Sequence, residues 1–265
     1  MSGNLVCVGI GMTLGAHICP IAKSYIQEAD VVFSGVSNGI VELWIQEMHN
    51  DVRSLQQYYC EGKPRNITYK EMVEAMLTEV RAGKKVVGAF YGHPGVFAYA
   101  PHKSIELAKK EGFEARMIPG ISAEDCLFAD LGIDPGKFGC AQYEASQLMF
   151  YRRIIDTSAY LILWQVGIAG DKSLGKFSTS KAYRQVLIDL LAEDYPMDHQ
   201  VILYEAAVLP IDDIRIEKIT LAEFINAKLS QHTTMVIPPG KKMQTNDVIL
   251  KRLAVLDSDL KEQNN

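Results

Sequence analysis

Short apolar runs alternate with amphipathic segments along the first half of the chain. The apolar runs are rich in β-branched residues and have the length of buried strands, and the segments between them have the period of a helix. We expect strands at 5–8, 30–34, 52–55, 86–91 and 115–118, and helices ending near 29 and spanning 39–48, 68–82 and 101–111. Because strands that alternate with helices pair in parallel, this half predicts a parallel α/β sheet.

The second half has a different order of elements. We expect strands at 139–143, 160–166, 200–204 and 233–237, and helices at 181–193, 221–229 and 246–256. The glycine- and serine-rich stretch 167–180 is interpreted as a flexible excursion. The change of pattern places a boundary within 119–134, which predicts domains at 1–120 and 121–258 and a frayed polar end at 259–265.

The loop after the fourth expected strand has the strongest local signal for a ligand site. Two glycines and a proline interrupt the apolar run in Tyr91-Gly92-His93-Pro94-Gly95-Val96-Phe97. Ligands of open α/β sheets bind beyond the carboxyl ends of the strands, where glycines let the backbone approach a ligand closely. The loop therefore predicts a small-molecule site without identifying the molecule.

The first strand also ends in a glycine loop, which resembles part of the dinucleotide-binding fingerprint. After Gly9 and Gly11, however, the third glycine, Gly15, comes one position late. The second strand then runs into Gly35 without the acidic residue that would bind a ribose. NAD binding is therefore not favoured.

Helix ends are indicated at several positions. Thr68 and Glu71 have the spacing of a capping box, which predicts a helix with Thr68 as its N-cap and Gly83 just beyond its end. Ser122 precedes Glu124 and Asp125, whose charges complement a helix N-terminus, so Ser122 is expected to cap the following helix.

Composition excludes several classes of protein. The chain has 265 residues, a formal net charge of −5 and a pI near 5.7, which argues against nucleic-acid binding. Its five scattered cysteines and six histidines show no metal-ligand spacing, so we expect reduced thiols, no metal and a cytoplasmic protein. Neither an export leader nor an apolar run long enough to cross a membrane is expected.

These motifs together resemble the tetrapyrrole methylase superfamily. The likeness rests on Gly9-x-Gly11, on the Gly-x-Pro-Gly loop that begins at Gly92, and on Pro119-Gly120-Ile121-Ser122-Ala123 after the fifth strand. The resemblance implies a two-domain α/β fold with a mainly parallel N-terminal sheet and a mixed C-terminal sheet. It also implies an S-adenosylmethionine-dependent methyltransferase with the cofactor in the cleft between the domains. His93 departs from the Gly-Asp-Pro loop that is typical of the superfamily.

That departure points to one branch of the superfamily, the borosin peptide backbone α-N-methyltransferases. The segments 91–97, 115–131 and 165–167 resemble this branch closely, and so does the pattern Tyr58-Tyr59 followed by Gly62-Lys63-x-Arg65-x-x-Thr68-Tyr69. Only a short charged stretch follows Leu256, with no apolar core peptide, so the resemblance is to split members that methylate a separate precursor in trans. It further implies a homodimer, in which a partner subunit helps to enclose the substrate, or a heterotetramer with two precursors.

The chemistry of amide methylation explains which side chains such an enzyme needs. The lone pair of an amide nitrogen is delocalised into the carbonyl, so the nitrogen is a poor nucleophile. Arg65 would stabilise negative charge on the carbonyl oxygen and lower the pKa of a nearby phenol. Tyr69 or Tyr59 could then accept the amide proton, and Tyr91 could bind the substrate or the cofactor. By resemblance, Arg65 and Tyr69 are the catalytic pair.

The resemblance also assigns a set of residues to cofactor binding. These are Tyr91, His93, Val96, Phe97, Ser122, Ala123, Gln165, Ala207, Val208, Thr233 and Thr234. Simpler interpretations stay open: the paired tyrosines could pack on the core, Arg65 could be a solvated charge, and Ser122 could be only a helix cap. Two other functions also stay open, namely a tetrapyrrole C-methyltransferase and a non-catalytic protein that binds S-adenosylmethionine.

Overall fold

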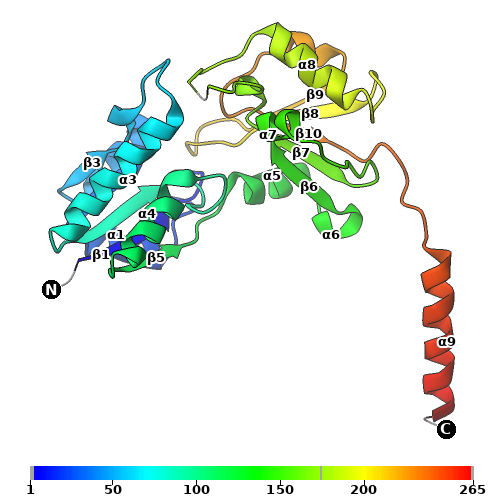
Figure 1. Cartoon of the computed structure of the whole chain (residues 1–265), viewed down its shortest axis with the longest axis horizontal. Helices are drawn as coiled ribbons and strands as arrows, with labels where there is room; N and C mark the ends of the chain where they lie inside the picture. Colours follow the sequence, from blue (N-terminus) through cyan, green and yellow to red (C-terminus); the bar gives the residue numbers. More distant parts are fainter. Residues whose placement is uncertain (1–2, 174, 264–265) are drawn as a thin grey trace.

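The computed structural model describes residues 3–173 and 175–263, with the side chains of 257–263 left out, and contains two separate β-sheets (Figure 1). The first sheet has five parallel strands in the order β3-β2-β4-β1-β5. These strands are β1 (Asn4–Gly9), β2 (Val31–Gly35), β3 (Val52–Ser54), β4 (Lys85–Phe90) and β5 (Glu114–Ile118). The parallel sheet expected for the first half is confirmed.

Side chains from both faces of the first sheet are buried beneath helices. Leu5 and Cys7 of β1 pack in one cluster with α3 and α4, whereas Val6 and Val8 pack in a second cluster with α1 and α2. A strand buried on both faces requires a continuous apolar run, which the sequence shows. The elements around this sheet are α1 (Pro20–Gln27), α2 (Gly39–Met48), the 3₁₀ turn η1 (Gln56–Tyr58), α3 (Arg65–Arg81) and α4 (Tyr99–Lys110).

The second sheet is mixed, as expected. Its order is β6-β7-β10-β8-β9, in which β6 and β7 are parallel and the other neighbours are antiparallel. The strands are β6 (Cys140–Glu144), β7 (Tyr160–Trp164), β8 (Gln200–Glu205), β9 (Arg215–Thr220) and β10 (Thr234–Ile237).

Helices cover the second sheet on both faces. Leu187 and Leu191 of α8 pack in one cluster with Leu161 and Leu163 of β7, and Leu127 of α5 packs in another with Ile162. The elements of this half are α5 (Ala123–Leu131), α6 (Pro135–Phe138), α7 (Ala145–Phe150), η2 (Val166–Ile168), α8 (Lys181–Leu191), η3 (Glu223–Asn226) and α9 (Asp247–Gln263).

The start of α3 differs from the expectation. The helix begins at Arg65 rather than after Thr68, so the predicted capping box is wrong. Thr68 is buried within the helix, and its Oγ1 donates a hydrogen bond to the Tyr58 carbonyl oxygen at 3.2 Å. Glu71 instead forms an ion pair with Lys63. The expected cap at Ser122 is confirmed, because Ser122 and Asp125 form a reciprocal capping box at the start of α5.

Two expectations for the second half are wrong. The helix predicted at 221–229 is only the short 3₁₀ turn η3, and the strand before it, β9, was not predicted. Residues 259–263 continue α9 instead of forming a frayed end. The stretch 167–180 contains an ordered turn, in which the buried Asp171 carboxylate accepts backbone hydrogen bonds from Gly175 and Lys176 at 2.9 Å.

Helix α9 extends away from both sheets (Figure 1). Its apolar side chains at Val248, Leu250, Leu253 and Leu256 are each more than half exposed in this single chain. No helix in the described part of the chain is long and apolar enough to cross a membrane.

Candidate active site

Three glycine loops meet beyond the carboxyl ends of β1, β4 and β5. Gly11 and Gly92 form an isolated bridge, in which the Gly92 N–H donates to the Gly11 carbonyl oxygen at 2.8 Å. A Cβ atom placed on Gly120 would lie 2.3 Å from the Gly92 carbonyl oxygen and 2.8 Å from the Gly9 Cα. Because a side chain at Gly120 would overlap backbone atoms, the convergence of the three loops requires glycine there.

The loop after β4 is held in shape by two histidines. His93 Nδ1 accepts a hydrogen bond from the Gly95 N–H at 2.9 Å, so the histidine shapes the turn that contains it. His102 on α4 bonds to the Gly95 carbonyl oxygen at 2.9 Å through its Nε2. These contacts explain how a turn with few apolar side chains keeps a defined shape.

A cavity of about 510 Å³ opens beside these loops and reaches the ends of β7, β8 and β10. Nine of the residues assigned to cofactor binding line it: Tyr91, His93, Val96, Phe97, Ser122, Ala123, Gln165, Val208 and Thr234. Ala207 and Thr233 are not among its lining residues. The Ala207 carbonyl oxygen accepts a hydrogen bond from Thr13, and Thr233 is fully buried with its hydroxyl bonded to Glu205.

Acidic groups line this cavity, and the sequence indicated only Glu124 among them, as a charge at a helix N-terminus. Glu205 pairs with Arg215 at 2.6 Å. Although burial would raise the pKa of Glu205, its hydrogen bonds with Thr233 and Arg215 lower that pKa overall. Glu124 accepts a hydrogen bond from the Gln142 side chain at 2.5 Å. Carboxylates at strand and helix ends are common on protein surfaces, so only the fold distinguishes those that face a cavity.

A second cavity, of about 330 Å³, adjoins the first. It is lined by Arg65 and Tyr69 of α3 and shares Phe97, Ala98 and Gln165 with the first cavity. The predicted catalytic pair thus lies in a cavity that adjoins the glycine-loop cavity of the same chain. For clarity, the 510 Å³ space is called the loop cavity and the 330 Å³ space the arginine cavity.

Aromatic contacts position the tyrosines of the arginine cavity. The Tyr69 ring stacks on Tyr99 with centroids 5.6 Å apart, and the Tyr59 ring meets Tyr69 edge-on at 6.5 Å. Tyr59 itself is not a lining residue of either cavity. The segment before α3 is tied to the helix because the Tyr58 carbonyl oxygen accepts hydrogen bonds from Lys63 at 3.0 Å and from Thr68.

The junction between the cavities has an unusual backbone. Phe97 and Gln165 have φ values of 48° and 58°, and in the described residues no other non-glycine residue has a positive φ. This conformation is unfavourable for residues with a Cβ, and such strain is concentrated at functional sites. The two residues follow strands of different sheets, so each sheet contributes one strained residue to the same junction.

The tyrosine pKa values differ from the expectation. Loss of hydration raises the pKa of Tyr59 well above its ordinary value, the neighbouring phenols Tyr69 and Tyr91 raise it further, and Arg65 only partly offsets these effects. Tyr91 is 52% exposed as a whole residue, yet its pKa is also raised, mainly by desolvation. The prediction that Arg65 gives a nearby phenol a lowered pKa is therefore wrong for these two tyrosines, because burial outweighs the guanidinium charge.

Arg65 itself lacks partners. Its Nε is buried without a hydrogen bond, and its guanidinium forms no ion pair with any residue in the described ranges. A buried donor without a partner costs stability, which is explained if a ligand oxygen completes the site. Glu144 also lines this cavity and was not identified from the sequence.

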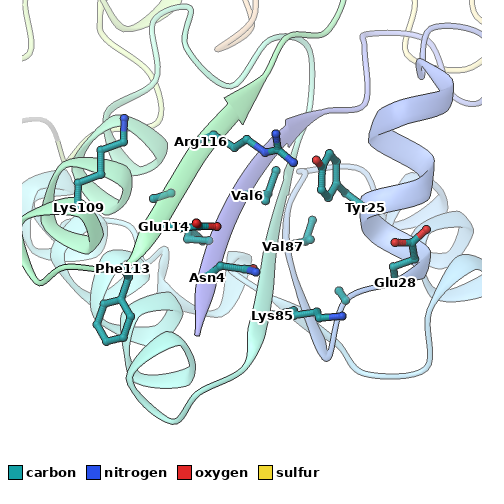
Figure 2. A pocket seen from close by; sticks show the side chains of 13 residues that line it. Asn4, Val6, Tyr25, Glu28, Lys85, Val87, Lys109, Phe113, Glu114 and Arg116 are labelled. Carbon is teal, nitrogen blue, oxygen red and sulfur yellow. The ribbon is translucent and has the colours of Figure 1, made fainter. Parts of the chain in front are cut away.

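Another cavity, of about 560 Å³, lies at the opposite end of the first sheet (Figure 2). It is lined by residues at the amino ends of the strands, including Asn4, Lys85 and Glu114. Figure 2 shows Arg116 and Tyr25 pointing toward one another, with the guanidinium 4.8 Å from the ring centroid. Since ligands of such sheets bind at the carboxyl ends, we assign no ligand to this groove.

Within 3–173 and 175–263, no group of three or more histidine, cysteine, aspartate or glutamate side chains is placed to hold a metal ion.

Comparison with known proteins defines the class of this fold and site. The family model of the tetrapyrrole (corrin/porphyrin) methylases matches residues 4–224, and the chain belongs to this family. Within the family, the resemblance to the borosin methyltransferases is confirmed by curated relatives that carry this name.

Two fungal relatives illustrate the likeness. The chain is 42% identical over 264 residues to a methyltransferase/ribosomally synthesized cyclic peptide precursor for gymnopeptides from Gymnopus fusipes, which covers 97% of this chain and 62% of that protein. It is 40% identical over 267 residues to a methyltransferase/type I borosin cyclic peptide precursor from Coprinopsis marcescibilis, covering 97% of this chain and 68% of that protein. The chain thus spans about three fifths of the length of the first relative.

Solved structures confirm the fold expected from the sequence. A cobalt precorrin-4 methyltransferase of cobalamin biosynthesis superposes with a TM-score of 0.62 at 18% identity, covering 89% of this chain and 94% of that one. A uroporphyrin-III C-methyltransferase from Thermus thermophilus gives a TM-score of 0.62 at 16% identity, covering 90% and 93%. At these identities the likeness concerns the fold alone.

Proposed function

We propose that this protein is an S-adenosylmethionine-dependent methyltransferase that α-N-methylates backbone amides of a separate ribosomal precursor peptide. The observation that carries the proposal is the junction of two cavities at Phe97, Ala98 and Gln165. A glycine-loop cavity on one side and an unpartnered arginine on the other suit a methyl donor and an acceptor amide that meet at this point.

The loop cavity fits the proposed cofactor in shape and in charge. Gly92 lines the cavity, so the backbone of the loop after β4 is accessible there. Glu124 and Glu205 add negative charge to the lining, which suits a ligand with a sulfonium and an ammonium group. When bound, S-adenosylmethionine would supply an electrophilic methyl group.

The arginine cavity fits an amide acceptor. The guanidinium of Arg65 presents N–H donors without a partner in the described residues, so it can donate hydrogen bonds to a substrate carbonyl oxygen and stabilise the charge that develops on that oxygen. Tyr91 lines the adjoining loop cavity, and because its pKa is raised, its phenol stays protonated at neutral pH and can donate a hydrogen bond. Tyr59 lines neither cavity and packs edge-on against Tyr69. The aromatic rings of Tyr69 and Tyr99 form an apolar wall against which a peptide can pack.

The proposed partners are a precursor protein and a second copy of this chain. The curated relatives are named as methyltransferase and precursor in one protein, which supports a ribosomal peptide as the substrate class. We propose that here the precursor is separate. The exposed apolar side chains of α9, including Leu250 and Leu253, support association into a homodimer. The domain boundary within 119–134 is part of the same proposal, because each sheet forms on one side of it.

Mass spectrometry tests the proposed reaction. The full-length protein is incubated with S-adenosylmethionine and a candidate small precursor protein, and the products are fragmented. We expect mass gains of whole methyl groups located on main-chain nitrogens. Methylation of side chains alone, or methylation of a porphyrinoid acceptor instead of the peptide, would contradict the proposal and favour another acceptor.

Isothermal titration with S-adenosylhomocysteine gives a separate test of cofactor binding. A protein that binds this product analogue and the precursor but never transfers a methyl group would be the non-catalytic alternative. Binding together with turnover would exclude it.

A further inference from the structure

Glu144 occupies a position that no motif indicated. It is the last residue of β6 and lies opposite Trp164 of β7 in the parallel register. Gln165, which separates the two cavities, follows Trp164 directly in the chain. The carboxyl ends of two parallel strands therefore place Glu144 next to the junction, where it lines the arginine cavity together with Arg65 and Tyr69.

The Glu144 carboxylate is unpaired among the described residues. Its side chain forms no hydrogen bond or ion pair with any residue that the structure describes, although it ends a strand and precedes α7. Burial raises the pKa of Glu144, and the Arg65 charge offsets part of this increase. Arg65 and Glu144 thus belong to the same cavity, and neither is engaged with another side chain.

Apart from Arg65 and Glu144, the charged groups that line this cavity are already engaged. The Asp171 carboxylate accepts hydrogen bonds within its own turn, and its pKa is lowered by them despite burial. The Lys176 ammonium donates to the Tyr183 hydroxyl at 2.9 Å and lies over that ring. Tyr69 and Tyr99 stack on one another. Glu144 is therefore the carboxylate in this lining that is free to act on a ligand.

A trans peptide bond has the geometry to contact Arg65 with one polar group and Glu144 with the other. Its carbonyl oxygen and its N–H point in opposite directions from one planar unit. A carbonyl that accepts from Arg65 on α3 directs its N–H away from α3, toward the part of the cavity that the second sheet forms. We propose that Glu144 accepts the proton of the substrate amide as the general base of methyl transfer, which rests on the proposed function.

The step balances in atoms and charge. The amide nitrogen forms a bond to the methyl carbon, the carbon–sulfur bond breaks with its electron pair on sulfur, and the amide proton passes to the Glu144 carboxylate. A free amide N–H is too weak an acid for a carboxylate to remove. Its acidity rises as the carbon–nitrogen bond forms, because the nitrogen loses electron density, so the proton leaves in the same step. Arg65 stabilises the carbonyl oxygen meanwhile.

The tyrosines fit the donor role better than the role of base. A phenol is protonated at neutral pH even at its ordinary pKa near 10, and burial raises the pKa of Tyr59 and of Tyr91 further. A carboxyl group has a much lower ordinary pKa than a phenol, so a carboxylate that lines the cavity is the better proton acceptor. This assigns donation to Tyr91, which lines the adjoining loop cavity, and acceptance to Glu144.

Glutamine and aspartate variants test the inference in the full-length protein. Glu144→Gln keeps the shape but cannot accept a proton, so we expect the single-turnover rate of precursor methylation to fall about 10²- to 10⁴-fold. Glu144→Asp, which retains a carboxylate, should recover part of that loss. The matched control is Glu114→Gln, which changes an exposed strand glutamate at the other end of the first sheet.

Three further measurements separate a base from a structural group. Titration calorimetry should give unchanged affinities of Glu144→Gln for S-adenosylhomocysteine and for the precursor. The acid limb of the pH–rate profile should be present in the wild type and absent from the residual activity of Glu144→Gln. In the cofactor-free protein, nuclear magnetic resonance of labelled glutamate carboxyls should show one resonance that titrates above the usual range and is lost in Glu144→Gln.

The outcomes are distinct from those of the proposed function. A wild type that never methylates the precursor refutes both statements. A wild type that methylates it, with Glu144→Gln working at the same rate and with the same pH profile, refutes only the role of Glu144. Loss of precursor binding in Glu144→Gln in proportion to the loss of rate would also overturn the inference, because the residue would then serve binding alone.

Discussion

The ring of Phe97 contacts the ring of Trp164, with the centroids 5.7 Å apart, and this contact joins the two halves of the chain. Phe97 lies in the loop after β4 of the first sheet, and Trp164 ends β7 of the second. Phe97 and Gln165, the neighbour of Trp164, are the non-glycine residues with positive φ in the described part of the chain, and both line the two cavities. This backbone strain therefore lies where the proposed donor and acceptor meet.

Replacing Gln165 tests whether this strain serves activity. Glycine adopts the left-handed conformation without a Cβ penalty, so Gln165→Gly should leave the free energy of unfolding within about 1 kcal/mol of the parent value. Methylation should fall, because the side chain that lines both cavities is gone. Urea denaturation and precursor mass spectrometry measure the two effects. Parental activity in this variant would show that neither the Gln165 side chain nor the strain that it causes has a role in the reaction.

Arg65→Lys tests the need for a guanidinium. Lysine keeps the positive charge but lacks the planar fork of N–H donors, so we expect the methylation rate to fall about 10²- to 10³-fold. The same change at Arg81, which lies at the exposed end of α3 and pairs with Glu74 and Glu111, is the matched control and should be neutral. Time courses followed by mass spectrometry decide. Equal rates for Arg65→Lys and the parent would exclude a directed role of the guanidinium.

Gly120→Ala tests the convergence of the glycine loops. The new Cβ would lie 2.3 Å from the Gly92 carbonyl oxygen, so the loops must separate. We expect a loss of stability on the order of 1–3 kcal/mol, as for other overpacked sites, together with weaker S-adenosylhomocysteine binding. Gly39→Ala at the start of α2 is the control, because nothing lies within 4 Å of its new Cβ. Identical denaturation midpoints for the two variants would mean that the loops yield without cost.

Tyr59→Phe tests how the buried phenol affects the free energy of unfolding at alkaline pH. The pKa of Tyr59 is raised from its ordinary value near 10, so the folded state holds this proton more tightly than the unfolded state. Its contribution to stability is present below about pH 10 and is lost as the pH rises toward the folded-state pKa. Tyr59→Phe should therefore lose stability less steeply above pH 10 than the parent, measured by urea denaturation at each pH. The same change at exposed Tyr151 is the control, and an unchanged slope in Tyr59→Phe would contradict the prediction.

Local pattern was sufficient for much of the fold. In β1, Leu5 and Cys7 face one layer of helices and Val6 and Val8 face the other, so a continuous apolar run predicted a strand covered on both sides. The Ser122 cap could also be predicted, because a capping box is a contact between residues three positions apart. Edge strand β9 could not be predicted from local pattern, because its sequence is largely polar and it forms a strand only by pairing with β8.

The sequence by itself determined the two-sheet α/β class, the glycine loops and, through resemblance, the presence of Arg65 and Tyr69 in one site. Tertiary structure decided where α3 begins, because the Thr68 hydroxyl donates a hydrogen bond to the Tyr58 carbonyl oxygen instead of capping the helix. It also decided that burial, rather than the Arg65 charge, determines the direction of the pKa shift of Tyr59. Finally, it placed Glu144 in the lining of the arginine cavity. The reason is physical: capping, periodicity and glycine turns depend on residues close in sequence, whereas desolvation and opposed charges depend on residues that only the packing of two sheets brings together.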